Sequence, residues 1–175
     1  LLGPNCLGVV DTKNDFNASF SAQKPLQGKI AFLSQSGALG TALIDWANGQ
    51  GVGISKFISL GNESCLTEIE FLEYLENDPD TSAILMYLEN VKDGPKFLET
   101  VKRITPNKPV VIIKAGMGNH GNLAVRSHTG ALAPEASVFV SACKQAGAVT
   151  VSSLRAFFHL AKILPQVWDK NVPVQ

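Results

Sequence analysis

Lys29-Ile30-Ala31-Phe32-Leu33-Ser34-Gln35-Ser36-Gly37 is the stretch that decides the fold of this chain. The apolar residues Ile30 to Leu33 predict a short buried strand, and the small polar residues after them predict a tight turn. A helix is expected next, because apolar residues recur at helical spacing until Gly49 and Gly51: Leu39, Leu43, Trp46 and Ala47. Strand, turn and helix together form the repeating unit of an α/β domain.

The same unit recurs along the rest of the chain. Further strands are predicted at Ile54 to Leu60, Ala83 to Leu88, Val110 to Ile113 and Ala148 to Val151. Helix starts are predicted after them, at Thr67 with Glu70 as a capping box, at Asp93-Gly94-Pro95, near Pro134 and at Ser153. Five apolar strands alternating with helices predict a flavodoxin-like three-layer α/β sandwich, a five-stranded parallel sheet of order 2-1-3-4-5 with helices on both faces. Residues 9 to 28 lack this periodicity and predict an extended linker or edge segment.

The composition narrows the class of partner. Fifteen basic and fifteen acidic residues give a formal net charge of zero, so the sequence predicts small-molecule or protein partners and no nucleic acid. No apolar run reaches about 18 residues and no charged-then-apolar leader opens the chain, which predicts a cytoplasmic protein without membrane contact. Three cysteines without a CxxC pair favour a reducing compartment, core filling and no metal site: Cys6, Cys65 and Cys143.

The chain opens on Leu1-Leu2-Gly3-Pro4-Asn5-Cys6-Leu7-Gly8 rather than on Met. This opening starts in the middle of a strand and turn pattern. We therefore expect the sequence to be a piece of a larger polypeptide.

Ser127-His128-Thr129-Gly130-Ala131-Leu132-Ala133 places an imidazole in a small-residue loop after the strand Pro109 to Lys114. Ligands of open α/β sheets bind outside the carboxyl ends of the strands. A histidine there can take and return a group at neutral pH, because its unperturbed pKa is about 6.5 and the neutral ring is a nucleophile. A surface-loop histidine without function is the alternative.

Two other segments could serve this histidine. Ser34 to Gly37 open a helix, where backbone N–H groups and the helix dipole bind phosphate or carboxylate; an ordinary cap at Ser36 is the equal alternative. Glu89 ends the third predicted strand and could accept the Nδ1–H of His128, leaving Nε2 free to attack; a solvated glutamate is the alternative. Glu63 is a similar but weaker candidate.

Two familiar motifs are set aside. Gly116 to Gly121 has the spacing GxGxxG, but a dinucleotide site needs a helix at once and an acidic residue at the end of the next strand, whereas Glu135 precedes that strand. A flexible loop is the better interpretation. Ser36, Glu89 and His128 follow the chain order of α/β-hydrolases, but the glycines that flank the nucleophile two residues away are missing.

With these residues assembled, the chain resembles the CoA-ligase domain of the ADP-forming acyl-CoA (acetate-CoA) synthetases, relatives of the succinyl-CoA synthetase α subunit. The resemblance rests on seven phrases in order: 3–8, 33–40, 59–63, 71–75 with Asp78-Pro79, 86–89, 108–116 and 127–133. It implies a tail of a preceding CoA-binding domain with a linker (1–28), a succinyl-CoA synthetase-like, flavodoxin-like ligase domain (29–168) and a C-terminal tail (169–175).

The resemblance also implies an acid-thiol ligase that interconverts acyl-CoA, ADP and phosphate with acid, CoA and ATP. In such enzymes an acyl phosphate passes its phosphoryl group to a loop histidine, which matches His128, and the loop carries it to an ATP-grasp domain. Glu89 then matches the carboxylate that steadies the histidine, and Ser34, Gln35, Ser36 and Gly37 match the phosphate-binding segment. Ser127, Thr129 and Gly130 belong to the loop.

CoA and ATP or ADP with Mg²⁺ are expected to bind mainly outside this chain, with phosphate at the site. The expected partners are the N-terminal CoA-binding domain, an ATP-grasp domain or subunit and a small carboxylic acid, within an oligomer. Pro134 stands where relatives commonly have Gly and should stiffen the end of the loop. Without its other domains, this piece should not complete the reaction.

Two alternatives come from other classes. One is the ligand-sensing, non-catalytic ligase-like module of a protein lysine acetyltransferase, in which the loop histidine is often replaced. The retained pair of His128 and Glu89 favours the ligase. A stand-alone receiver-like domain is the other, but the chain lacks the clustered aspartates of a receiver.

Overall fold

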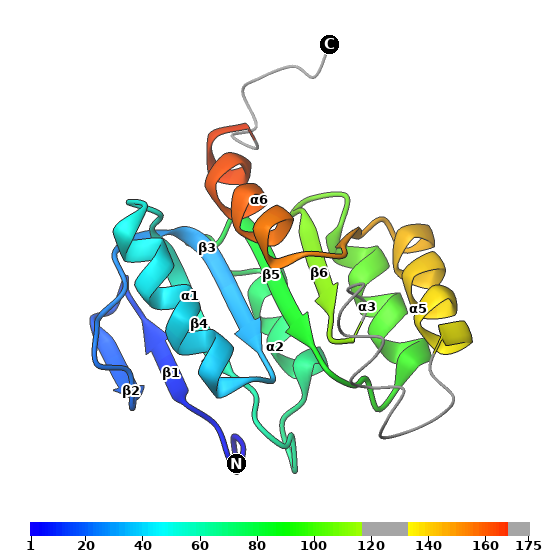
Figure 1. The fold of residues 1–175 in the computed structure, drawn as a ribbon, viewed down its shortest axis with the longest axis horizontal. Helices are drawn as coiled ribbons and strands as arrows, with labels where there is room; N and C mark the ends of the chain where they lie inside the picture. The colour runs from blue at the N-terminus through cyan, green and yellow to red at the C-terminus, as the bar shows by residue number, and fades with distance from the viewer. Residues whose placement is uncertain (117–132, 168–175) are drawn as a thin grey trace.

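The computed structural model describes residues 1–116 and 133–167, which build one mixed sheet between two layers of helices (Figure 1). The sheet has seven strands in the order β2-β1-β4-β3-β5-β6-β7. Their bounds are β1 Gly8–Asp11, β2 Phe16–Ser19, β3 Gln27–Ser34, β4 Ile54–Ser59, β5 Ala83–Leu88, β6 Val110–Lys114 and β7 Val149–Val151.

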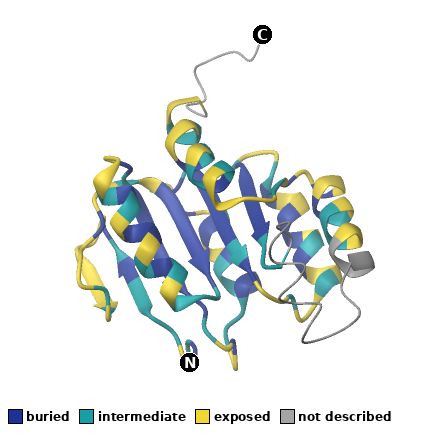
Figure 2. Cartoon of the chain, viewed as in Figure 1, coloured by how far each residue is buried: buried dark blue, intermediate teal, exposed yellow. Residues whose placement is uncertain are grey.

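Five described helices cover the two faces. α1 (Gly37–Gly49) and α6 (Leu154–Val167) pack on one face, and α2 (Glu68–Glu76), α3 (Gly94–Ile104) and α5 (Ala133–Gln145) pack on the other. The central strands are buried on both sides, as Figure 2 shows in dark blue, which explains why they appear in the sequence as continuous apolar runs. No helix within the described ranges is long and apolar enough to cross a membrane.

The parallel part of the sheet confirms the predicted strand order. β3, β4, β5, β6 and β7 are the five predicted strands, and they lie as β4-β3-β5-β6-β7, which is 2-1-3-4-5 in chain order. The predicted total of five strands is wrong. β1 pairs antiparallel with both β4 and β2, so residues 8–19 extend the sheet by two strands. These strands have four residues each and β2 is almost wholly exposed, so neither gives an apolar run.

The predicted helix starts are confirmed, including the last one, since α6 begins directly after Ser153, whose Oγ accepts the Ala156 N–H. Ser36 caps α1 and Asp93 caps α3, each accepting a backbone N–H from three residues on. Thr67 and Glu70 form the predicted capping box of α2. Pro134 lies in the first turn of α5, where proline is compatible with a helix.

The start of α1 is held close to the sheet. Gly40 faces the ring of Phe57 on β4, and a Cβ built on Gly40 would lie 2.5 Å from the ring carbon Cζ. Only glycine lets the helix approach this closely without displacing the ring. The packing therefore places the first turn of α1 at the carboxyl ends of the central strands.

A buried ion triad fastens β1, β4 and the end of α2 at the opposite, amino edge of the sheet. The Lys56 ammonium lies 3.3 Å from the Asp78 carboxylate and 3.4 Å from the Asp11 carboxylate, and its side chain is 4% exposed. Burial opposes the charge on Asp78, but hydrogen bonds from Thr81 and the Asp80 N–H, together with Lys56, hold the pKa of Asp78 below its ordinary value.

We predict that Lys56→Met destabilises the protein by about 3–5 kcal/mol, because it leaves two acidic groups without their cation in a buried place. Urea denaturation followed by circular dichroism measures the loss. The exposed Lys102 on α3 provides the control, and Lys102→Met should change stability by less than about 0.5 kcal/mol. A loss for Lys56→Met as small as that of the control would contradict the role of the triad.

Candidate functional site

A hollow of about 540 Å³ opens at the carboxyl edge of the sheet. Four segments line it: residues 5–7 of the N-terminal turn, residues 35–38 between β3 and α1, residues 61–62 after β4, and Glu89 after β5. Phe20 and Thr41 complete the wall. The structure thus brings Gln35, Ser36 and Gly37 together with Glu89, as the sequence predicted from strand ends alone.

The turn before α1 is built by its own serines. Ser36 Oγ accepts the Leu39 N–H at 3.3 Å, which is the ordinary capping interaction. Ser34 is buried beneath the hollow, where its Oγ donates to the Ser36 carbonyl at 2.8 Å and accepts the Ser36 N–H at 3.2 Å. Both hydroxyls therefore form hydrogen bonds within the turn. The residues at the start of α1 line the hollow.

That helix start carries a partial positive charge. The first N–H groups of a helix have no partner within the helix, and the aligned peptide dipoles add to their charge. The first turn of α1 contains no acidic side chain that would compensate it. The N–H groups of Gly37 and Ala38, both on the wall of the hollow, can therefore bind an anionic oxygen.

The Gln35 side chain points toward the turn that follows β5. Its Oε1 accepts the N–H groups of Glu89 and Asn90, the latter at 2.9 Å, and its Nε2 donates to the Asn90 carbonyl at 2.9 Å. The Gln35 side chain is therefore committed to the turn after β5. No local sequence pattern predicts this contact, because the partners are 54 and 55 residues away.

Glu89 is exposed on the wall of the hollow, at the end of β5. Its carbonyl accepts a hydrogen bond from Lys114 Nζ at 2.6 Å, which ties it to the end of β6. Burial, followed by the charge of Glu89, raises the pKa of the Tyr87 hydroxyl two residues earlier. Sequence analysis missed Lys114 as part of the site, although its position at a strand end was a usable signal.

His128 lies outside the described residues, as do its loop neighbours Ser127, Thr129 and Gly130. The described chain leaves β6 through Ala115, whose N–H donates to the Leu88 carbonyl at 2.8 Å, next to Glu89. The segment that contains His128 therefore starts at the same edge of the sheet as the hollow. Its placement relative to Glu89 stays a prediction.

Glu63 does not line the hollow. It adopts φ 53°, is 4% exposed and turns inward toward Glu68 at the start of α2. Both Glu68 oxygens and one Glu63 oxygen are buried without a hydrogen-bond partner among the described residues. Burial, followed by the neighbouring Glu63, raises the pKa of Glu68 from 4.5 to about 7.

This pair predicts a pH-dependent stability. An unfolded glutamate keeps its ordinary pKa, so folding takes up protons between about pH 4.5 and 7, and stability falls as the pH rises through that window. Glu68→Gln removes the ionisation and should make the protein about 1–3 kcal/mol more stable at pH 8, with little gain at pH 5. Thermal unfolding at both pH values measures it.

The control for this prediction is Glu99→Gln on the exposed side of α3, which should leave stability unchanged at both pH values. An equal gain for Glu68→Gln at pH 5 and pH 8 would contradict the buried ionisation.

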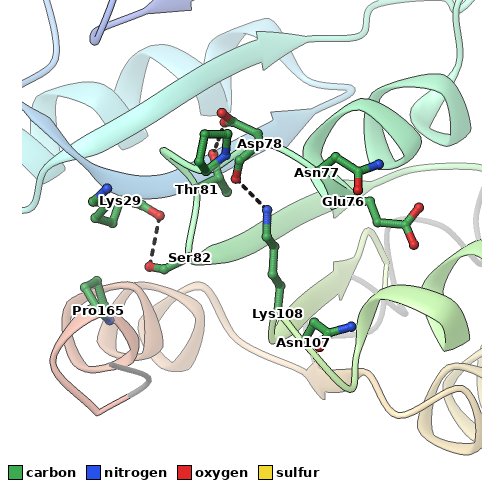
Figure 3. A pocket seen from close by; sticks show the side chains of 10 residues that line it. Lys29, Glu76, Asn77, Asp78, Thr81, Ser82, Asn107, Lys108 and Pro165 are labelled. Atoms are coloured by element: carbon green, nitrogen blue, oxygen red, sulfur yellow. Dashed lines mark hydrogen bonds between the residues drawn. The ribbon is translucent and has the colours of Figure 1, made fainter. Parts of the chain in front are cut away.

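A second hollow, of about 630 Å³, lies at the amino edge of the sheet (Figure 3). Two of its polar side chains bond to the protein itself: Lys108 Nζ donates to the carbonyls of Leu75 and Asp78 at 2.6 Å each, and Ser82 Oγ donates to the Lys29 carbonyl. These contacts hold together the loops at the amino edge of the sheet. The described residues that the sequence predicts for the site, Gln35, Ser36, Gly37 and Glu89, line the smaller hollow at the opposite edge.

A flavodoxin-like sandwich with a helix start and a carboxylate at the switch point of its sheet defines a class of ligand-binding α/β domains. Residues 27–164 match the model of the succinyl-CoA ligase-like flavodoxin domain, and the chain belongs to that family. The family prediction made from the sequence is thereby confirmed.

Three similar proteins give the context. An ADP-forming acetate–CoA ligase I from Archaeoglobus fulgidus is 46% identical over 94% of this chain and 24% of its own length. The α subunit of such a ligase from Pyrococcus furiosus is 41% identical over 99% of this chain and 38% of its own length. A solved acetyl-coenzyme A synthetase 1 from Ca. Korarchaeum cryptofilum, in complex with phosphate and ADP, superposes with a TM-score of 0.85 at 37% identity, over 94% of this chain and 36% of that one. The chain thus spans well under half of these relatives.

Proposed function

We propose that this chain is the ligase domain of an ADP-forming acyl-CoA synthetase and that His128 carries a phosphoryl group between its two half-reactions. The observation that carries the proposal is the shared hollow at the carboxyl edge. An uncompensated helix start and the carboxylate of Glu89 line it together, next to the point where the His128 segment leaves β6.

Each described group has a role in this proposal. The N–H groups at the start of α1 bind the phosphoryl oxygens, and their partial charge stabilises the negative charge that builds up during transfer. Glu89 accepts the Nδ1–H of His128, so that Nε2 is the nucleophile and the charged ring is stabilised after phosphorylation. A carboxylate and a helix start fit these tasks because one attracts the cationic ring and the other attracts the anion.

The other parts of the reaction belong to the rest of the enzyme. We assign residues 1–28 to the tail of a CoA-binding domain with its linker, 29–168 to the ligase domain and 169–175 to a C-terminal tail. CoA, ATP or ADP with Mg²⁺ and a small carboxylic acid bind mainly to the partner domains of an oligomeric, cytoplasmic ligase. The acetate–CoA ligases among the relatives, and the phosphate and ADP of the solved synthetase, support this division.

The full-length protein incubated with radiolabelled ATP and Mg²⁺ should acquire acid-labile, base-stable phosphate on His128. His128→Asn should abolish the label, and Glu89→Gln should reduce its rate of formation by about 10-fold or more while the protein stays folded. Phosphopeptide mapping and the acid and base stability of the label measure both effects.

His159 on the exposed side of α6 is the matched control, and His159→Asn should label like the unsubstituted protein. A label that survives His128→Asn would refute the proposed carrier. An unchanged rate in Glu89→Gln would remove Glu89 from the mechanism.

A further inference from the structure

We infer that Gln35 is a positioning residue, whose side-chain amide clamps the turn after β5 and holds the Glu89 carboxylate at the start of α1. The inference rests on the proposed function and deepens it. Gln35 acts through Glu89 rather than on the phosphoryl group. The resemblance placed Gln35 in a phosphate-binding segment and assigned no separate role to its side chain.

The clamp continues the sheet beyond its last strand residues. β3 and β5 pair in parallel as far as Ser34 and Tyr87, and the Gln35 N–H then donates to the Tyr87 carbonyl at 3.1 Å. Beyond this point the amide of the Gln35 side chain makes the hydrogen bonds to the chain after β5 that a neighbouring strand would otherwise make. It accepts the N–H groups of Glu89 and Asn90 and donates to the Asn90 carbonyl.

These three hydrogen bonds fix which way the amide faces. Its oxygen meets two N–H donors and its nitrogen meets a carbonyl, and rotating the amide by half a turn would set donors against donors. The Glu89 N–H, the Asn90 N–H and the Asn90 carbonyl therefore all find a partner on Gln35 in only one orientation of its amide. The resulting turn has one conformation, and it fixes the Cα–Cβ direction of Glu89.

Glu89 is held from both sides. Gln35 on the β3 side takes its N–H, and Lys114 on the β6 side donates to its carbonyl. An exposed glutamate at a strand end would otherwise move with its loop, because its side chain has no packing to fix it. Catalytic geometry depends on such supporting contacts. At metal sites the loss of comparable contacts typically costs about 10–100-fold in affinity or activity, and we expect a loss of that order here.

The experiment compares two substitutions that separate a clamp from a phosphate ligand. Gln35→Leu keeps the volume and removes all three side-chain hydrogen bonds. Gln35→Glu keeps the acceptor for the Glu89 and Asn90 N–H groups, loses the donor to the Asn90 carbonyl and adds a negative charge. A clamp predicts that Gln35→Glu retains more activity than Gln35→Leu, whereas a phosphate ligand predicts the reverse order, because the added charge repels phosphate.

The measurement is the rate of His128 labelling by radiolabelled ATP and Mg²⁺ in the full-length protein. Gln35→Leu should label about 10-fold more slowly, and Gln35→Glu should recover part of that rate. Combined with Glu89→Gln, Gln35→Leu should cause no further loss, because both changes remove the same positioned carboxylate. Gln50→Leu at the far end of α1 is the matched control and should leave the rate unchanged.

The possible outcomes separate the two proposals. A labelled unsubstituted protein with the reverse order of the two Gln35 variants, or with losses that multiply in the double variant, overturns the clamp and leaves the phosphohistidine intact. An unlabelled unsubstituted protein overturns both. If Gln35→Leu does not fold, as judged by circular dichroism, Gln35→Met takes its place: losses that multiply when it is combined with Glu89→Gln overturn the clamp, and no further loss supports it.

Discussion

The parallel pairing of β3 with β5 is the constraint on which the rest of this structure depends. After β3 the chain crosses through α1 to β4 on one side, and after β5 it crosses through α3 to β6 on the other side and over the opposite face. Connections that diverge from neighbouring strands leave a crevice between their first turns. Gln35 and Glu89 meet at this crevice although 54 residues separate them in the chain.

The two edges of the described sheet differ in whether their charged groups have partners of opposite charge. At the amino edge, Lys56 lies between Asp11 and Asp78 and forms an ion pair with each of them. At the carboxyl edge, the start of α1 has no acidic residue in its first turn, and Glu63 and Glu68 meet without a hydrogen-bonded cation because Lys92 donates to backbone carbonyls instead. Unbalanced groups cost stability, and they are typical of the edge where a protein of this class binds ligands.

The elements that were predictable are those whose signals are local. The apolar runs of β5 and β6 are buried on both faces, and the caps at Ser36 and Thr67 bond within three residues. For residues 9–28 the sequence left open an extended linker or an edge segment, and β1 and β2 confirm the edge segment. Neither was predicted as a separate strand, because each has four residues and too few alternating positions to show a period. The inward turn of Glu63 was missed because glutamates in loops are mostly exposed to solvent.

By itself, the sequence determined the family, through motif phrases that run along the chain, and the parallel order of five strands, because burial periodicity and capping depend on neighbours in the chain. Only the tertiary structure decided what each polar group at that edge does. In the folded protein the Gln35 amide bonds to the turn that contains Glu89, and the Ser34 hydroxyl bonds to the Ser36 carbonyl. Glu63 lies next to Glu68. These contacts follow from strand register and from the packing of segments distant in the chain, which no local pattern encodes.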